Sequence, residues 1–376
     1  MAPASSTASP HAPEGLRTLL VPWSVLAWSA ALMGVGLGWL AGVLPRGVPD
    51  TDGFGSLFIG QSLGTASAAA IGVGAAGVVV ALLLLRRGGA GGRPAEVAAW
   101  AMAAVVLLVF VDGSLLVLFG YSMMLPFVGW FVPGLFAMWI AAVLEPTSLT
   151  LLFCALGTAL WVVAALTHSR ARRRACQQCG RHEQWSAQGE REVRSRATVV
   201  GRWAVAVGVV LALLYPALRF PWLFGLAPGM SEESAARVMA EPGTVLIGVG
   251  LGATGAVGAV LMLGLVQRWG VRFPRWMVGL AGRRVPVSLA VVPAALVSMA
   301  LMSMGRSVIV QLASEGQVAT PLVEDLHSIV FVLMAPWGVA LAVATAAYAM
   351  RRRAECALCE RGLPEVVPGR TPAARV

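Results

Sequence analysis

Long apolar stretches alternate with short polar segments along almost the whole chain. Eight of these stretches reach about 20 residues, the length that crosses the hydrocarbon core of a bilayer as a helix. Backbone groups in lipid must find their hydrogen bonds within the protein, which favours helices over open strands. We therefore expect an all-α fold, a polytopic membrane helix bundle with spans near residues 19–44, 57–85, 96–119, 147–167, 198–219, 243–266, 286–305 and 328–349.

A ninth apolar stretch, residues 130–143, is too short to span a bilayer and follows Pro126 and Pro133. It is typical of an interfacial or re-entrant helix at the outer surface. The first span is too long for the core of a signal peptide, so we expect the mature protein to retain it.

Two Cys-x-x-Cys pairs lie at equivalent places, the second 180 residues after the first. Each pair follows a run of three arginines that closes an apolar stretch, at residues 172–174 and 351–353. Trp23 and Trp203 share the same offset. This pattern predicts two parallel four-helix repeats, related by an axis along the membrane normal because each contains an even number of spans. The expected organisation is a disordered tail at 1–16, a first repeat at 17–182, a cytoplasmic linker at 183–197, a second repeat at 198–362 and a disordered tail at 363–376.

Composition and charge agree with a membrane protein. The mean hydropathy is +0.78, with 58% hydrophobic and 12% charged residues, which excludes an ordinary soluble globular protein. Placing both termini in the cytoplasm puts all but four of the 28 basic residues on that side, as the positive-inside rule requires. We expect a multi-pass protein of the cell membrane with both cysteine pairs cytoplasmic. The net charge of +10 then reflects topology, so the expected partners are the lipid bilayer and an unidentified membrane or cytoplasmic protein, with no nucleic acid.

The four cysteines of the two pairs are candidate metal ligands. Cys176 and Cys179 precede Gly180 as in a zinc knuckle, whereas Cys356 and Cys359 precede Glu360 and match less well. Four thiolates complete a tetrahedral structural zinc site. The sequence thus predicts a zinc ion shared between the repeats; two separate redox dithiols, or surface cysteines without a ligand, are the alternatives.

Charged residues near the outer ends of the spans form a second candidate site. Asp112 lies within an expected span, where an ionisable side chain is costly and commonly functional. The repeat places Arg306 at a nearly equivalent position, and we expect the two charges to pair. They could line an outer cavity; headgroup-level solvation of the same side chains is the alternative. The full candidate set is Asp112, Arg306, Arg219, Glu145, Glu324 and Asp325.

Glycines cluster in the second and sixth expected spans. Gly72, Gly74 and Gly77 resemble the series from Gly248 to Gly258. Small residues let helices approach closely in lipid, so we expect tight packing and a central place for both helices.

Several motifs in the second half carry a family resemblance. They are Tyr215-Pro216-Ala217-Leu218-Arg219 through Trp222 and Gly225 to Pro228-Gly229-Met230-Ser231-Glu232-Glu233, Gln267-Arg268-Trp269-Gly270, Phe273-Pro274-Arg275-Trp276, and Gly282-Arg283-Arg284-Val285-Pro286. With these segments the chain resembles uncharacterised multi-pass membrane proteins of actinobacteria, a family for which the resemblance implies no activity, cofactor or catalytic residue.

No motif for catalysis or nucleotide binding is found, so we expect a protein that is not an enzyme. The leading hypothesis is a transporter-like protein, or an accessory to membrane traffic of a small molecule, with a cytoplasmic zinc clip. A sensor or scaffold that reports metal or redox state through the four cysteines is one alternative, and a membrane thiol oxidoreductase is another.

Overall fold

Helices form the regular structure of this chain. The computed structural model describes residues 16–50, 54–86, 92–275, 277, 279–314 and 326–364. Within these ranges no strand is present, and a single isolated β-bridge joins Arg272 and Arg284. Eight helical segments are long and apolar enough to cross a membrane, as the hydropathy pattern predicts. They are α1 (Leu16–Leu40), α2 (Leu63–Leu85), α3 (Gly92–Phe110), α6 (Pro146–Arg172), α7 (Ala187–Arg219), α9 (Pro242–Gly264), α10 (Val287–Ser314) and the pair α12 (Leu326–Val332) and α13 (Met334–Arg351).

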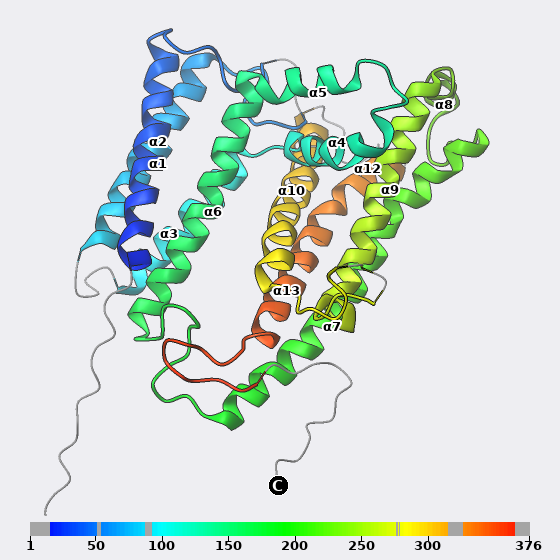
Figure 1. The fold of residues 1–376 in the computed structure, drawn as a ribbon. Coiled ribbons are helices and arrows are strands. Elements are labelled where there is room, and N and C mark those ends of the chain that lie inside the picture. The colour runs from blue at the N-terminus through cyan, green and yellow to red at the C-terminus, as the bar shows by residue number, and fades with distance from the viewer. Residues whose placement is uncertain are drawn as a thin grey trace, which may run out of the picture.

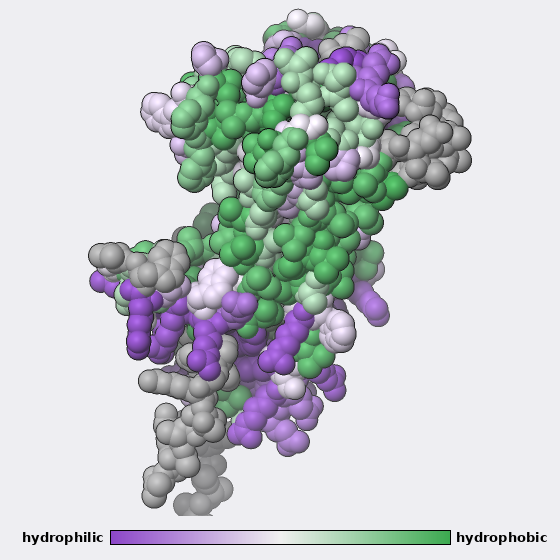
Figure 2. All heavy atoms as spheres, turned by 90° about the vertical axis from the view of Figure 1, so that its right-hand side faces the viewer, coloured by the Kyte–Doolittle hydropathy of each residue, from purple (hydrophilic) through white to green (hydrophobic). Residues whose placement is uncertain are grey.

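The surface shows the same division as the sequence. Figure 2 shows an apolar band between two ends that carry hydrophilic side chains. This chain therefore has the architecture of a multi-pass membrane protein. One end of the bundle carries the loops 173–186 and 352–364, the cysteine loops, and is called the cysteine end (Figure 1).

The expected span 96–119 is wrong at its C-terminal end, because α3 ends at Phe110. The Asp112 carboxylate accepts a hydrogen bond from the backbone N–H of Ser114, at 2.9 Å, and a new helix, α4 (Ser114–Val128), begins there. A short polar side chain bonded to its own backbone competes with helix continuation. Hydropathy alone does not detect this break, since α4 is itself apolar.

Shorter elements cover the end opposite the cysteines. The ninth apolar stretch forms α5 (Leu135–Leu144), which runs across that end of the bundle rather than through it (Figure 1). It follows Gly134, whose φ of 79° turns the chain into the helix. The 3-10 helix η1 (Phe220–Phe224) and helix α8 (Glu232–Met239) link α7 to α9 at the same end, whereas η2 (Arg268–Gly270) follows α9 at the cysteine end.

The spans pack as two groups. In the first half α1 contacts α2 and α6, and α3 contacts α6; in the second half α7 contacts α9 and α13, and α10 contacts α13. The same order of contacts thus recurs in both halves, while the duplication inferred from the sequence stays a prediction. Between the halves, α3 contacts α10, and α4 packs on both α9 and α10.

The glycine-rich helices pack closely, but α2 does not lie in the centre. Figure 1 shows α2 beside α1 at one edge of the bundle. A Cβ added at Gly74 would lie 2.6 Å from the backbone nitrogen of Met33, and one at Gly36 would lie 2.9 Å from the carbonyl oxygen of Ser67. The two backbones are therefore nearly in contact. Small residues allow a helix to approach one neighbouring helix closely. They do not indicate whether that pair of helices lies at the centre or at the edge of the bundle.

We expect Gly74→Leu to lower the free energy of unfolding by about 1–3 kcal/mol, because the side chain would push α1 and α2 apart. Gly72→Leu in the same helix is the matched control, since nothing lies within 4 Å of a Cβ at Gly72. Thermal unfolding of both variants in one detergent, followed by circular dichroism, measures the difference. Equal midpoints for the two variants would contradict the close α1–α2 contact.

Candidate metal centre

Each cysteine pair lies in a tight loop just after a long helix. The first loop follows the end of α6 at Arg172, and the second follows the end of α13 at Arg351. In the first loop the N–H of Cys176 donates to the carbonyl of Arg181, at 2.9 Å, and in the second the N–H of Cys356 donates to the carbonyl of Arg361, at 3.0 Å. These bonds close the two loops in the same way, 180 residues apart.

The residue after each pair completes the turn. The N–H of Gly180 donates to the carbonyl of Cys176, at 2.7 Å, and the N–H of Glu360 donates to that of Cys356, at 2.8 Å. Gly180 has a φ of 74° and Glu360 a φ of 54°, so both occupy the left-handed region. Glu360 therefore adopts a backbone conformation that favours glycine, at a cost of roughly 1–2 kcal/mol.

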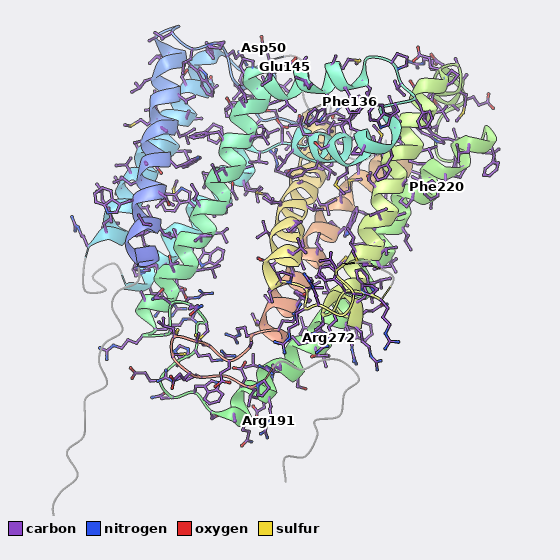
Figure 3. All side chains as sticks on the ribbon, in the orientation of Figure 1. Asp50, Phe136, Glu145, Arg191, Phe220 and Arg272 are labelled. Atoms are coloured by element: carbon purple, nitrogen blue, oxygen red, sulfur yellow. The ribbon has the colours of Figure 1, made fainter. Side chains whose placement is uncertain are left out.

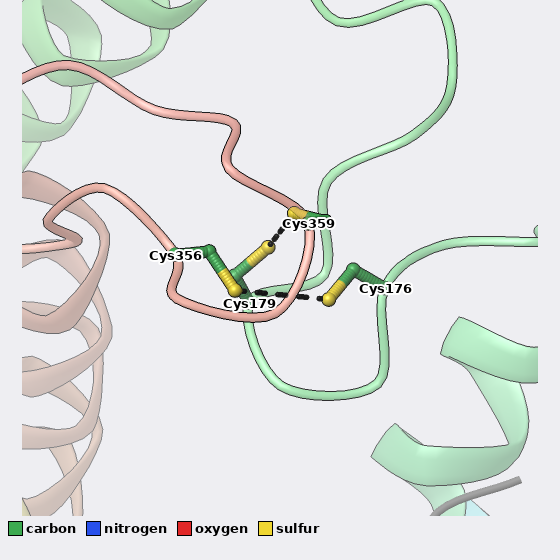
Figure 4. Close-up of side chains that lie close together, drawn as sticks. All are labelled: Cys176, Cys179, Cys356 and Cys359. Carbon is green, nitrogen blue, oxygen red and sulfur yellow. Dashed lines mark hydrogen bonds between the residues drawn. The ribbon is translucent and has the colours of Figure 1, made fainter. Parts of the chain in front are cut away.

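The loops bring the four sulfur atoms together (Figure 4). All four Sγ atoms lie within 4.8 Å of one another, and the distances across the halves are 3.5 Å for Cys179 to Cys359 and 3.9 Å for Cys176 to Cys356. A tetrahedral zinc ion with bonds of about 2.3 Å needs sulfur atoms about 3.8 Å apart. The cluster therefore fits such an ion with small adjustments, and the prediction that the two pairs meet is confirmed.

The thiols differ in their readiness to ionise. Burial opposes ionisation of Cys356, but backbone N–H groups of Cys359 and Leu358 and the neighbouring thiols lower its pKa to about 7. Burial and the adjacent thiols raise the pKa of Cys359 to about 12, and burial also raises the pKa of Cys179. The cluster thus accommodates one thiolate readily and disfavours a second. A bound cation removes this penalty, because a coordinating thiol loses its proton to the metal.

A buried arginine joins the two loops. Arg181 is 3% exposed and forms a forked pair with Glu190 of α7, with Nε to Oε2 at 3.1 Å and Nη2 to Oε1 at 2.9 Å. Its Nη1 donates to the carbonyls of Ala354 and Arg361 in the second loop, each at 3.0 Å. Its Nη2 also donates to the carbonyl of Arg353, at 3.3 Å. One side chain from the first loop therefore satisfies backbone acceptors of the second.

A second arginine binds the end of the second loop to α7. Arg194 is buried beside Glu190, with Nε 3.4 Å from Oε1. Its terminal nitrogens donate to the carbonyls of Arg353, Leu363 and Pro364, at 2.6, 2.9 and 2.8 Å. Charge-assisted bonds of this kind are among the stronger hydrogen bonds in proteins.

The second loop returns two bonds to the first. Arg353 donates through Nη1 to the carbonyl of Cys179, at 3.1 Å, and Arg361 donates to the carbonyl of His182, at 3.0 Å. The His182 ring is exposed, with Nδ1 3.2 Å from the carbonyl of Arg173, and is not part of the sulfur cluster.

Sequence reasoning missed Arg181, Glu190 and Arg194. The mixed charges of residues 183–197 were expected to form a solvated linker, whereas α7 begins at Ala187 and buries two of them. One signal was present in the sequence, since Arg181 and Arg361 share the offset of the cysteine pairs. Nothing in the sequence indicates that only Arg181 reaches inward.

Asp112 and Arg306 lie near each other without a direct hydrogen bond or ion pair between them. Asp112 is 4% exposed and accepts a hydrogen bond from the N–H of Ser114, the first residue of α4. Nη2 of Arg306 donates to the carbonyl of Val111, at 3.1 Å, and to the hydroxyl of Ser307. The guanidinium of Arg306 therefore lies near Asp112, but it bonds to the backbone of the preceding residue, Val111.

The remaining outer residues lie elsewhere or outside the described ranges. Arg219 stacks on Trp222, with its guanidinium carbon 4.1 Å from the ring centroid. Glu145 precedes α6 at the end opposite the cysteines (Figure 3). Among the described residues no hydrogen bond or ion pair connects any two of Asp112, Arg306, Arg219 and Glu145. Glu324 and Asp325 lie outside the described residues.

Arg181→Gln is expected to destabilise the protein by about 3–5 kcal/mol, because it leaves Glu190 buried without its principal partner. Arg361→Gln, at the equivalent position of the second loop, removes only an exposed bond and should cost about 0.5 kcal/mol or less. Thermal unfolding and limited proteolysis of the cysteine loops measure both variants. A comparable loss in the two would show that Arg181 does not hold the loops together.

Comparison with protein-family models, with curated proteins and with solved structures finds no match to this chain. The functional argument therefore starts from its own residues. These form a bundle of eight apolar spans and, at one end, a cluster of four cysteines drawn from both halves.

Proposed function

We propose that this chain is a non-enzymatic, transporter-like protein of the cell membrane whose two halves are joined by one structural zinc ion on the cytoplasmic face. The observation that carries the proposal is the meeting of four sulfur atoms from loops 180 residues apart. Four thiolates leave zinc no open coordination position, as in structural rather than catalytic sites. Thiolate ligands also favour soft metals such as zinc over magnesium or calcium.

The distribution of arginines supports the cytoplasmic placement. Arg191 and Arg272 lie at the cysteine end, whereas Asp50 and Glu145 lie at the opposite end (Figure 3). Three arginine-rich segments, around residues 170–202, 268–284 and 351–361, follow the ends of α6, α9 and α13. This order of the spans places all three segments near the cysteine end. Loops rich in arginine remain in the cytoplasm.

The way the halves meet supports a transporter-like role. Each half packs mainly within itself, and the halves contact one another through α3, α4 and their neighbours α9 and α10. Alternating access in many transporters is a rocking of one helix group against another. A zinc ion at the ends of α6 and α13 would then be a fixed pivot between the groups.

The metal content of the purified protein tests the zinc clip. We expect about one zinc ion per chain, and its loss in both Cys176→Ser and Cys356→Ser, because a tetrahedral site needs all four thiolates. Cys154→Ala is the matched control, since Cys154 is buried within α6 and is not part of the cluster. Elemental analysis after gel filtration measures the metal.

Two results would contradict the shared site. A variant that keeps about half of the metal would indicate two independent sites. A wild-type protein that carries no zinc after purification in zinc-containing buffer would exclude the clip altogether. A chelator should also lower the unfolding temperature of the wild-type protein and leave that of Cys176→Ser unchanged, because metal binding stabilises the folded state.

Reporter fusions test the orientation. Alkaline phosphatase folds actively only outside the cytoplasm, so a fusion after Glu145 should be active and one after Arg191 inactive. The opposite pattern would place the cysteines outside and remove the basis for the cytoplasmic clip.

One observation favours a sensor or scaffold as the second candidate. Leu358, between the two cysteines of the second loop, is 57% exposed, so the tip offers an apolar contact beside the cluster. Zinc exchange separates the two roles, because a purely structural ion resists removal under conditions that leave the protein folded. The remaining alternative, a thiol oxidoreductase, requires the four thiols to cycle between reduced and oxidised forms in the cell, which thiol trapping would detect.

A further inference from the structure

A large apolar cavity lies in the second half of the bundle, outside the metal centre. Its volume is about 840 Å³, and it lies between α9, α10 and α13. Residues 265–286, called the arginine loop, close it at the cysteine end. Its walls include Leu263 of α9, Phe273 and Met277 of the arginine loop, Leu289 and Val297 of α10, and Trp337 of α13.

The cavity arises because α9 and α10 are held apart. In the first half α2 packs against α3, whereas the corresponding pair α9 and α10 has at most marginal contact. The arginine loop connects α9 to α10 and is fixed to α13. The Tyr348 hydroxyl donates to the carbonyl of Gly270, at 2.6 Å, and Nη2 of Arg351 donates to that of Leu265, at 2.6 Å.

The arginine loop also has internal order. The N–H of Phe273 donates to the carbonyl of Arg283, and the N–H of Val285 donates to that of Val271, both at 3.0 Å. The loop is therefore a folded cover rather than a loose connection. The wall that this loop contributes to the cavity is therefore held in place by hydrogen bonds.

The shape and chemistry of the cavity suit a hydrocarbon chain. The lining extends along α13 from Tyr348 to Trp337, eleven residues or about 16 Å at the helical rise of 1.5 Å per residue. An apolar cavity left empty loses the dispersion contacts of its walls, so an apolar occupant stabilises it.

The segment that borders the cavity at the cysteine end is strongly positive, although no arginine is among the lining residues. The arginine loop contains Arg268, Arg272, Arg275, Arg283 and Arg284, and the sequence has no acidic residue from Pro242 to Ser314. Arg272 lies between the lining residues Gly270 and Phe273, and its Nε is buried without a hydrogen-bond partner. An anionic group at this end of the cavity would be attracted by the positive charge of the arginine loop.

We propose that the cavity binds one anionic phospholipid of the membrane, with an acyl chain between α9 and α10 and the phosphate at the arginine loop. Basic pockets between membrane helices on the arginine-rich side recognise such headgroups through charge, while the apolar cavity holds the chain. This site is independent of the zinc clip, so either proposal stands if the other fails.

Spin-labelled phosphatidylglycerol in nanodiscs of phosphatidylcholine tests the proposal. We expect a motionally restricted lipid signal with the wild-type protein, and none above background with spin-labelled phosphatidylcholine. Ala294→Trp fills the cavity from α10 and should abolish the restricted signal, whereas Ala295→Trp, on the next residue but outside the lining, should preserve it.

A charge variant tests the headgroup contact. Arg272→Gln should weaken phosphatidylglycerol binding about fivefold, whereas Arg191→Gln on exposed α7 at the same end should leave it unchanged. Millimolar inorganic phosphate should not displace the lipid, since the acyl chain provides much of the affinity; displacement would mean a site for free phosphate and overturn the proposal. Equal signals from the two lipids, or equal binding by Ala294→Trp and Ala295→Trp, would also overturn it. If the tryptophan variant does not fold, Ala294→Leu, whose side chain fills less of the cavity, is compared with Ala295→Leu for the same loss of the restricted lipid signal.

Discussion

The buried guanidinium of Arg181 is the interaction on which the cysteine end of the bundle depends. It pairs with Glu190 of α7 and donates to carbonyls of the opposite loop, so it belongs to both halves at once. The bonds from Arg194, Arg353 and Arg361 add to this contact, but Arg181 alone joins the first loop both to α7 and to the backbone of the second loop. The four sulfur atoms are close because these polar contacts determine where each loop lies.

Much of the fold could be predicted because membrane spans are long and uniformly apolar. Hydropathy located all eight helices, and the equal offset of the cysteine pairs predicted that they meet. The start of α7 was missed, because the polar turns from Ala187 onward bury Glu190 and Arg194 against one loop rather than in lipid. Hydropathy contains no information about such a local burial of charge.

The other differences have local causes. Between α3 and α4, the side chain of Asp112 bonds to the backbone of Ser114 where the second helix begins, which a hydropathy average does not detect. Gly74 predicts close packing correctly, but the neighbour it packs against is α1 at the edge of the bundle. The arginine loop is a third case, since its folded form depends on bonds from Tyr348 and Arg351 that lie more than 70 residues away.

The order of the cysteines along the chain has a consequence for biosynthesis. Cys356 and Cys359 follow α13, so a ribosome has synthesised the helices from α7 to α13 before the second pair emerges. The first pair must wait in reduced form throughout that time. The sulfur cluster is therefore completed only in chains whose second half has been synthesised and has reached the first, which makes its closure a late mark of successful assembly.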